Sequence, residues 1–283
     1  MTNNSTFKLG PIGVFDSGYG GLTILSEITK LMPEYDYLYL GDNARTPYGN
    51  RSYELIYKFT LEAVKWLFSK GCQLVIIACN TASAKALRSI QLNYLPHVDP
   101  LKRVLGVIRP TAEIIENVTR TKHIAVLGTV ATIQSNSYER EIEKFSQDIK
   151  ITTEACPMWV PLVENKEYDK KGADYFVKQH IERVLERDQD IDTIILGCTH
   201  YPLLLKKIEK YTPEHVKVIS QGEYVAKSLR MYLNRHQVMD SMCSKNGKRL
   251  YYTTESAQEF EKSAFYFLNE KIKAKETGLA INE

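Results

Sequence analysis

The stretch CQLVIIACNTAS, residues 72–83, decides the fold prediction. Its first half is a continuous apolar run without alternation, which is typical of a parallel strand buried on both faces. The run ends at Cys79, and amide and hydroxyl side chains follow. A second apolar run, IDTIILG at residues 191–197, ends in the same way at Cys198, before Thr199 and His200. We therefore predict two buried strands that each carry a cysteine at the carboxyl end.

Further strands and helices are predicted on both sides of these runs. Short apolar segments at residues 12–15, 35–40 and 123–128 have the length and composition of strands. Apolar residues with helical spacing predict helices over about 52–70, closed by Gly71, and over 172–187. Strands that alternate with helices indicate an α/β fold with parallel sheets.

The order of elements partly repeats along the chain. The spacing from Asp16 to Gly128 nearly equals the spacing from Cys79 to Cys198, which favours two similar half-chains. The remaining segment, residues 221–283, has two helical patterns and one strand-like stretch, RLYYTT at 249–254. The sequence alone does not assign this segment to either half.

The composition is that of an ordinary globular protein. The chain has 283 residues, of which 43% are hydrophobic and 25% charged. With 37 basic and 34 acidic side chains, the net charge of +3 gives no argument for a nucleic-acid or membrane partner. No stretch approaches about 18 uninterrupted apolar residues, and the start, MTNNSTFKLG, lacks a signal-peptide core. We expect a short polar N-terminal tail and a cytoplasmic protein.

The cysteines carry no motif of a metal or redox site. Five cysteines without a signal peptide indicate a reducing compartment. CxxC and HExxH spacings are absent, and DSGYGG at residues 16–21 is neither a P-loop nor a GxGxxG fingerprint. We therefore expect no metal and no cofactor. Outside the two strand ends, we interpret three cysteines as small buried hydrophobic residues: Cys72, Cys156 and Cys243.

The polar residues at the predicted strand ends form a candidate ligand site. Ligands of open α/β sheets bind beyond the carboxyl ends of the strands. Asp16, Cys79, Thr129 and Cys198 each lie at or just after such an end. If the two halves face each other across a cleft, both cysteines approach one ligand. Groups that can hold carboxylates follow the cysteines: Asn80, Thr81, Ser83, Thr199 and His200.

Two opposed thiols suit proton exchange at a single carbon. One thiolate removes a proton, and a thiol on the far side delivers another, so that the carbon is inverted. Since a free thiol has a pKa of about 8.5, neighbouring groups must tune each cysteine. Asp16 beside Cys79 and His200 beside Cys198 are candidate partners, and Glu164, in VPLVENKE, is a further candidate acid or base.

Other interpretations of these residues stay open. Asp16, Ser17 and Gly18 also suit a turn and helix cap, and TPYG at residues 46–49 also suits a turn. Cys198 with His200 would suit a cysteine hydrolase, which forms a covalent acyl-enzyme. A non-catalytic binding protein would explain the hydroxyls but not two matched thiols.

Five segments in order resemble the glutamate racemases of the aspartate/glutamate racemase superfamily. They are GVFDSGYGGLTIL, TPYGNRS, ACNTASA, VPLVE and GCTHYPLL, and they run from about residue 12 to residue 202. The resemblance implies an isomerase that interconverts L- and D-glutamate without a cofactor and supplies D-glutamate for bacterial peptidoglycan. Another amino-acid racemase of the superfamily, such as aspartate racemase, is the alternative. The resemblance also implies a cytoplasmic homodimer that acts on a small molecule.

The resemblance further implies an architecture and a set of site residues. It predicts two pseudo-symmetric α/β domains, residues 1–108 plus 221–283 and residues 109–220, with the active site in the cleft between them. Cys79 and Cys198 correspond to the two acid/base thiols, which act on D-glutamate and on L-glutamate respectively. Thr129 and Glu164 are expected near the ligand. The family's substrate-contacting positions match Asp16, Ser17, Tyr48, Gly49, Asn80, Thr81, Thr199 and His200.

One departure from the family pattern lies in KVISQGEYVA, residues 217–226. Ser220 and Gln221 stand where the family often carries an aspartate. We expect this departure to leave the chemistry unchanged and to affect the domain hinge or a subunit contact.

Overall fold

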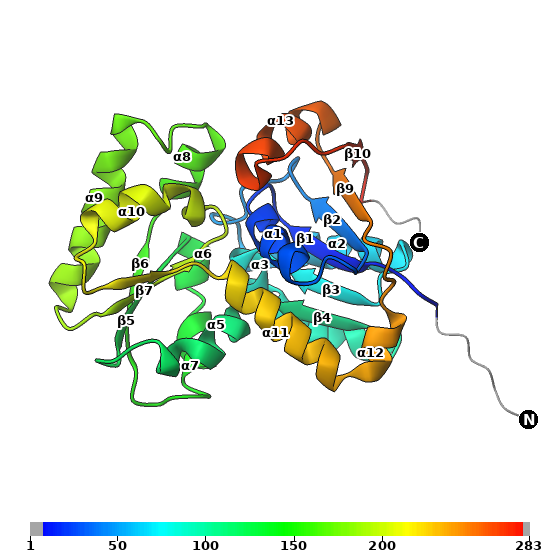
Figure 1. Cartoon of the computed structure of the whole chain (residues 1–283), viewed down its shortest axis with the longest axis horizontal. Helices are drawn as coiled ribbons and strands as arrows, with labels where there is room; N and C mark the ends of the chain where they lie inside the picture. Colours follow the sequence, from blue (N-terminus) through cyan, green and yellow to red (C-terminus); the bar gives the residue numbers. More distant parts are fainter. Residues whose placement is uncertain (1–7, 280–283) are drawn as a thin grey trace, which may run out of the picture.

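A computed structural model describes residues 8–279 and shows two lobes, each built on one parallel sheet (Figure 1). The first lobe combines the N-terminal strands with the last strands of the chain, and the middle of the chain forms the second lobe. Most of the predicted polar tail, residues 1–7, and the last four residues of the predicted first domain, 280–283, lie outside the described residues.

The first sheet has six strands in the order β10-β9-β2-β1-β3-β4, and all neighbouring pairs are parallel. Because β9 pairs with β2, the C-terminal segment completes the first sheet rather than the second. The strands are β1 Ile12–Asp16, β2 Tyr37–Gly41, β3 Leu74–Ile77, β4 Arg103–Gly106, β9 Arg249–Thr253 and β10 Ala274–Glu276.

The second sheet repeats the plan of the first. Its four parallel strands have the order β6-β5-β7-β8, which matches the order β2-β1-β3-β4 of four adjacent strands in the first sheet. This correspondence confirms the predicted α/β fold with two similar, parallel halves. The strands are β5 His123–Gly128, β6 Lys150–Ala155, β7 Thr193–Gly197 and β8 Lys217–Ile219.

The central strands are buried on both faces, as their unbroken apolar runs predict. Every residue of β1, β2, β3 and β7 is buried. In β1, Val14 joins the core cluster on one face and Phe15 joins the cluster on the other. Burial on both faces removes the polar alternation of a half-exposed strand.

Helices cover both faces of each sheet (Figure 1). The predicted helix over 52–70 is α2, which begins after Ser52, whose side chain caps it at Leu55 N, and ends before Gly71 at a φ of 94°. The predicted helix over 172–187 is α9. The α-helices are α1 Gly21–Leu31, α2 Tyr53–Ser69, α3 Asn80–Lys85, α4 Leu87–Ser89, α5 Ile108–Ile114, α6 Val130–Ile133, α7 Ser137–Ile142, α8 Trp159–Glu164, α9 Lys171–Arg187, α10 Leu205–Tyr211, α11 Gly222–Arg235, α12 Gln237–Met242 and α13 Ala257–Leu268.

The C-terminal segment contains more elements than its sequence pattern predicts. Two helical patterns were expected there, and α11 and α13 account for them, but α12 and β10 were not anticipated. The helix α12 has six residues and the edge strand β10 has three, which are too few for a periodic apolar pattern.

The chain passes between the two sheets twice. The first crossing follows β4 at Val107, and the second follows β8 at Ser220 and Gln221. The exact division into residues 1–108 plus 221–283 and residues 109–220 stays a prediction. Among the helices of residues 8–279, none is both long enough and apolar enough to span a lipid bilayer.

Candidate active site

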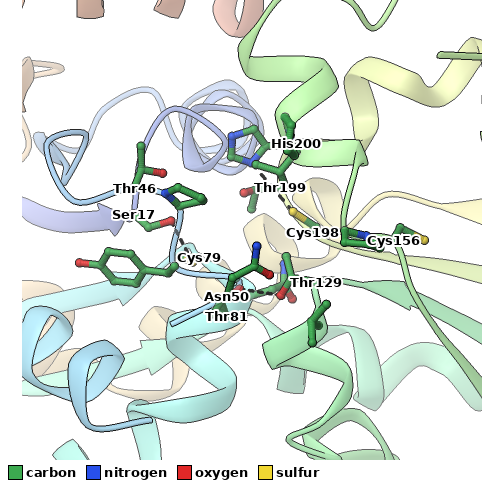
Figure 2. Close-up of a pocket in the computed structure, with 18 residues that line it drawn as sticks. Ser17, Thr46, Asn50, Cys79, Thr81, Thr129, Cys156, Cys198, Thr199 and His200 are labelled. Atoms are coloured by element: carbon green, nitrogen blue, oxygen red, sulfur yellow. Dashed lines mark hydrogen bonds between the residues drawn. The ribbon is translucent and has the colours of Figure 1, made fainter. Parts of the chain in front are cut away.

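The two lobes meet around a cavity of about 50 Å³ at the carboxyl ends of both sheets (Figure 2). Cys79 follows β3, and Cys198 follows β7, which has the equivalent position in the second sheet. Figure 2 shows Cys79 with Ser17 on segments of the first lobe and Cys198 with Cys156 on segments of the second lobe. The two matched strand ends therefore bring both predicted thiols to one cavity.

Cys79 caps the first turn of α3. Its sulfur accepts a hydrogen bond from the backbone N–H of Ala82 at 3.4 Å and lies 3.4 Å from the hydroxyl of Ser17. The residue is 5% exposed. Burial, together with the charge of nearby Asp16, raises the pKa of the Cys79 thiol to about 12. Cys79 is therefore a protonated thiol at neutral pH, the form that can donate a proton.

Asp16 lies at the end of β1, fully buried, behind the cavity wall. Its Oδ2 accepts from the backbone N–H of Gly18 at 2.9 Å, whereas its Oδ1 finds no hydrogen-bond partner among the described residues. Burial raises the pKa of the Asp16 carboxyl above its usual range, against the opposing effect of His200. The carboxyl thus sits beside Cys79 without lining the cavity itself.

Cys198 is paired with a histidine instead of a carboxyl. Nδ1 of His200 lies 3.9 Å from the Cys198 sulfur, and Nε2 lies 3.1 Å from Oε1 of Glu164. Burial of the ring opposes its charge, but the contacts with Cys198 and Glu164 outweigh this and raise the pKa of His200 to about 10. His200 is therefore protonated at neutral pH and places a positive charge beside the Cys198 sulfur.

A glycine allows the first lobe to approach this histidine. A Cβ at Gly20 would lie 2.3 Å from Oγ1 of Thr199 and 2.5 Å from Nδ1 of His200. On the same side, the hydroxyl of Thr23 donates to the carbonyl of Thr199 at 3.1 Å. The glycine-rich segment 18–21 therefore allows close packing between the lobes as well as the turn.

Hydroxyl groups form another part of the cavity wall. Oγ1 of Thr81 and Oγ1 of Thr129 lie 2.9 Å apart, so that a threonine from each lobe meets at the junction. Thr129 also caps α6 by accepting from Thr132 N at 3.2 Å. Among the described residues, no lysine or arginine lines the cavity. Neutral donors and protonated His200 are therefore the groups available to an anionic ligand.

The structure brings most of the predicted site residues together. Asp16 and Glu164 do not line the cavity. Burial and the charge of Asp16 raise the pKa of Cys79, and Glu164 accepts from Nε2 of His200. Tyr48 lines the cavity, while its hydroxyl donates to Asp42. Ser83 donates to the carbonyl of Ile77 and lies outside the lining. The predicted residues that line the cavity are Ser17, Tyr48, Gly49, Cys79, Asn80, Thr81, Thr129, Cys198, Thr199 and His200.

Several lining residues were missed by the sequence interpretation. Thr46 is the first residue of the TPYG turn and Asn50 directly follows it, so the turn itself was the signal that could have pointed to them. Cys156 is buried, as expected, but it also reaches the cavity wall. No sequence signal distinguishes the remaining apolar contributors, which are Pro47, Val130, Pro157, Val160 and Pro161.

The side chains that are close enough to share a metal ion lie away from this cavity. Within residues 8–279, one group of metal-ligating side chains is close enough to share an ion, namely His123, Asp188 and Asp190. His123 begins β5, whereas Thr129 follows its end, so this group lies at the opposite edge of the sheet.

Comparison with known proteins identifies a racemase family. The Asp/Glu/hydantoin racemase family model matches residues 22–229. A glutamate racemase of Persephonella marina is 40% identical over 252 residues, which are 89% of this chain and 90% of the relative. The structure of a glutamate racemase of Bacillus anthracis has a TM-score of 0.88 and 37% identity, covering 97% of this chain and all of that one. The structure of a Francisella tularensis glutamate racemase in complex with D-glutamate has a TM-score of 0.83 and 31% identity, covering 95% and 97%.

Proposed function

The chain belongs to the Asp/Glu/hydantoin racemase family, and from that membership we propose that it is a glutamate racemase, an isomerase that interconverts L- and D-glutamate without a cofactor. One observation carries the proposal beyond family likeness. Two cysteines at equivalent strand ends, Cys79 and Cys198, line one cavity from opposite lobes. Racemisation needs an acid and a base on opposite faces of one carbon, and this arrangement supplies both.

The proposed reaction from L-glutamate begins at Cys198. Its thiolate, paired with the imidazolium of His200, removes the α-proton and becomes a thiol. The electron pair of the broken C–H bond remains on the substrate as a carbanion. The Cys79 thiol then gives its proton to the opposite face, forming D-glutamate and leaving a thiolate at Cys79. From D-glutamate, the same steps run in reverse with the two cysteines exchanged.

The electrostatic surroundings of the cysteines support this assignment. Burial raises the pKa of the Cys79 thiol to about 12, so this thiol keeps its proton at neutral pH and can donate it. The positive charge of His200 beside Cys198 stabilises a negative sulfur, and Glu164 holds that charge by accepting from Nε2. In the proposed reaction Cys198 begins as the thiolate and Cys79 as the thiol, which is the combination that inversion of L-glutamate requires.

The remaining lining groups are suited to hold the substrate. Hydroxyls of Ser17, Thr81, Thr129 and Thr199, with the Asn80 amide, can donate to the two carboxylates of glutamate. Glutamate bound in so small a cavity would displace water, which would strengthen these interactions and protect the carbanion from unspecific protonation.

We extend the proposal to the cellular role and assembly that the family likeness implies. The product would be D-glutamate for peptidoglycan synthesis in the cytoplasm, and the working form would be a homodimer. The two crossings after β4 and β8 support domains of residues 1–108 plus 221–283 and residues 109–220.

Substrate choice is tested by circular dichroism with wild-type enzyme. We expect the signals of L- and of D-glutamate to decay to zero, while that of L-aspartate stays constant. Decay for aspartate but not for glutamate would assign the enzyme to the aspartate branch. A stable acyl group on Cys198, detected as a mass increase, would instead indicate a cysteine hydrolase, provided that Cys79→Ser turns over the acylating substrate as fast as wild type.

A further inference from the structure

Gln221 lies where the chain returns from the second lobe to the first, between β8 and α11. Its side chain is 3% exposed and forms four hydrogen bonds. The carbonyl Oε1 accepts from Nδ2 of Asn80 at 2.6 Å. The two N–H groups of Nε2 are shared among three acceptors, namely the carbonyl of Val107 at 3.1 Å, Oγ1 of Thr111 at 3.0 Å and the hydroxyl of Tyr138 at 2.8 Å.

These contacts close a ring of three side chains. The hydroxyl of Tyr138 donates to Oδ1 of Asn80 at 2.7 Å, so that Asn80, Gln221 and Tyr138 each contact the other two. Asn80 is 2% exposed and Tyr138 is 1% exposed. Because buried polar groups are costly to leave unpaired, removing one member penalises the other two. The ring therefore fixes both ends of the Asn80 amide.

The same side chain connects the two lobes at both crossings. The carbonyl of Val107 belongs to the first crossing, and Gln221 itself belongs to the second. Asn80 begins α3 of the first lobe, and Tyr138 lies on α7 of the second. A change in the angle between the lobes would pull these partners apart, so the complete set of contacts requires the observed arrangement, in which the lobes close around the cavity.

The ring also reaches the candidate active site. Asn80 follows Cys79 directly and lines the cavity. An amide offers two N–H donors and two acceptor lone pairs. Gln221 and Tyr138 use one of each, which leaves one N–H and one lone pair for a ligand.

We propose that Gln221 is a positioning residue that holds the Asn80 amide in its substrate-binding orientation and holds the two lobes closed around the cavity. For its substrate the proposal rests on the glutamate racemase function above, whereas its structural part rests on the hydrogen bonds alone. The residue acts through Asn80 and through the closed arrangement.

The first test compares Gln221→Met with Gln73→Met. Methionine keeps the length of glutamine but makes none of its hydrogen bonds. Gln73 is a matched control because it is also buried, but it precedes β3 and so lies at the end of the strand opposite Cys79. Its Nε2 donates to the carbonyls of Lys8 and Gly71 at 3.3 and 3.4 Å.

We expect Gln221→Met to raise the KM for glutamate about tenfold, because the apparent affinity falls with the fraction of closed, correctly aligned molecules. The kcat per folded molecule should change less than KM. Gln73→Met should lower the thermal midpoint but leave KM unchanged. A merely structural role of Gln221 would make the two variants alike, with lower Tm and unchanged KM, and would overturn the proposal.

Tyr138→Phe provides an independent variant that removes one hydroxyl and keeps the aromatic ring. It should also raise KM, and the double variant with Gln221→Met should raise KM by less than the product of the single effects, because the two residues share one ring. Should Gln221→Met fail to fold, Tyr138→Phe carries the test alone. An unchanged KM in Tyr138→Phe would then refute the proposal.

A second readout separates this proposal from the proposed function. Labelling of Cys79 by iodoacetamide, followed by mass spectrometry, needs no turnover. We expect faster labelling in Gln221→Met than in wild type and unchanged labelling in Gln73→Met. If wild type does not racemise glutamate but the labelling rates differ in this way, the proposed function fails and the role of Gln221 stands. Equal labelling in all three proteins overturns the role of Gln221, whether or not glutamate is racemised.

Discussion

Nδ1 of His200 lies 3.9 Å from the sulfur of Cys198, while the sulfur of Cys79 lies 3.4 Å from the hydroxyl of Ser17. The two cysteines are equivalent in strand position but not in their surroundings. Cys198 faces a protonated ring, and Cys79 sits beside the buried carboxyl of Asp16. We propose that this asymmetry gives Cys198 the base role and Cys79 the acid role toward L-glutamate.

Glu164→Gln should move the alkaline limit of activity. In wild type the activity should fall as the pH rises through the His200 pKa of about 10, because the ring then loses the proton that supports the Cys198 thiolate. The amide keeps a hydrogen-bond acceptor but loses the negative charge, so the ring should lose its proton about one pH unit lower or more. The measurement is kcat/KM for L-glutamate between pH 6 and about pH 10.5, a range that spans the His200 transition.

The matched control for this variant is Glu167→Gln, which neutralises an exposed glutamate three positions further along. Its alkaline limb should coincide with that of wild type. If the fall of kcat/KM at alkaline pH is unchanged in Glu164→Gln, the carboxylate of Glu164 does not stabilise the charge of His200.

Cys79→Ser should abolish racemisation but leave proton removal by Cys198 intact. Loss of a positioned acid or base costs about 10²- to 10⁴-fold in rate. Cys198 should still remove the α-proton of L-glutamate; when the Cys198 thiol then exchanges this proton with heavy water before giving a hydrogen back to the same face, deuterium enters L-glutamate without inversion. Nuclear magnetic resonance and a chiral assay together measure both quantities. Cys72→Ala, in the core of the first lobe away from the cavity, should racemise normally. Normal racemisation by Cys79→Ser would rule out a two-cysteine reaction.

Thr129→Val should weaken substrate binding and also cost stability. The substitution keeps the shape but removes the Oγ1 that meets Thr81 and caps α6 at Thr132 N. Loss of the cap should lower the free energy of unfolding by about 1 kcal/mol. KM should rise as well, since Thr129 lines the cavity. Ser52→Ala removes the cap of α2, remote from the cavity, and should show a similar stability loss without the KM change. Equal KM in the two variants would show that the Thr129 hydroxyl does not contribute to substrate binding.

Much of the fold could be predicted because its signals are local. The residues from Leu74 to Ile77 are buried on both faces, and an unbroken apolar run reports this directly. The limits of α2 follow from Ser52 and Gly71, which cap it by side-chain chemistry and by backbone conformation. In contrast, α12 and β10 are too short for a pattern, and they form because α11 and β9 place them against the first lobe.

The candidate site was predicted less completely, since its parts meet only after folding. The two cysteines stand out because each ends an apolar run. Gln221 gives no such signal: it lies 141 positions after Asn80, and nothing between them predicts the hydrogen bond that joins their amides. The sequence around Thr46 and Asn50 indicates only a turn. Their place in the cavity wall depends on how both lobes meet.

The most direct test of the two-cysteine reaction follows the hydrogen at the α-carbon in heavy water with wild-type enzyme. L-Glutamate is supplied, and both enantiomers are separated and analysed for deuterium during the first turnovers. We expect D-glutamate to carry deuterium, because the Cys79 thiol exchanges with solvent before it donates, and the remaining L-glutamate to carry none. D-Glutamate without deuterium, or equal labelling of the recovered L-glutamate, would contradict proton transfer between two opposed cysteines.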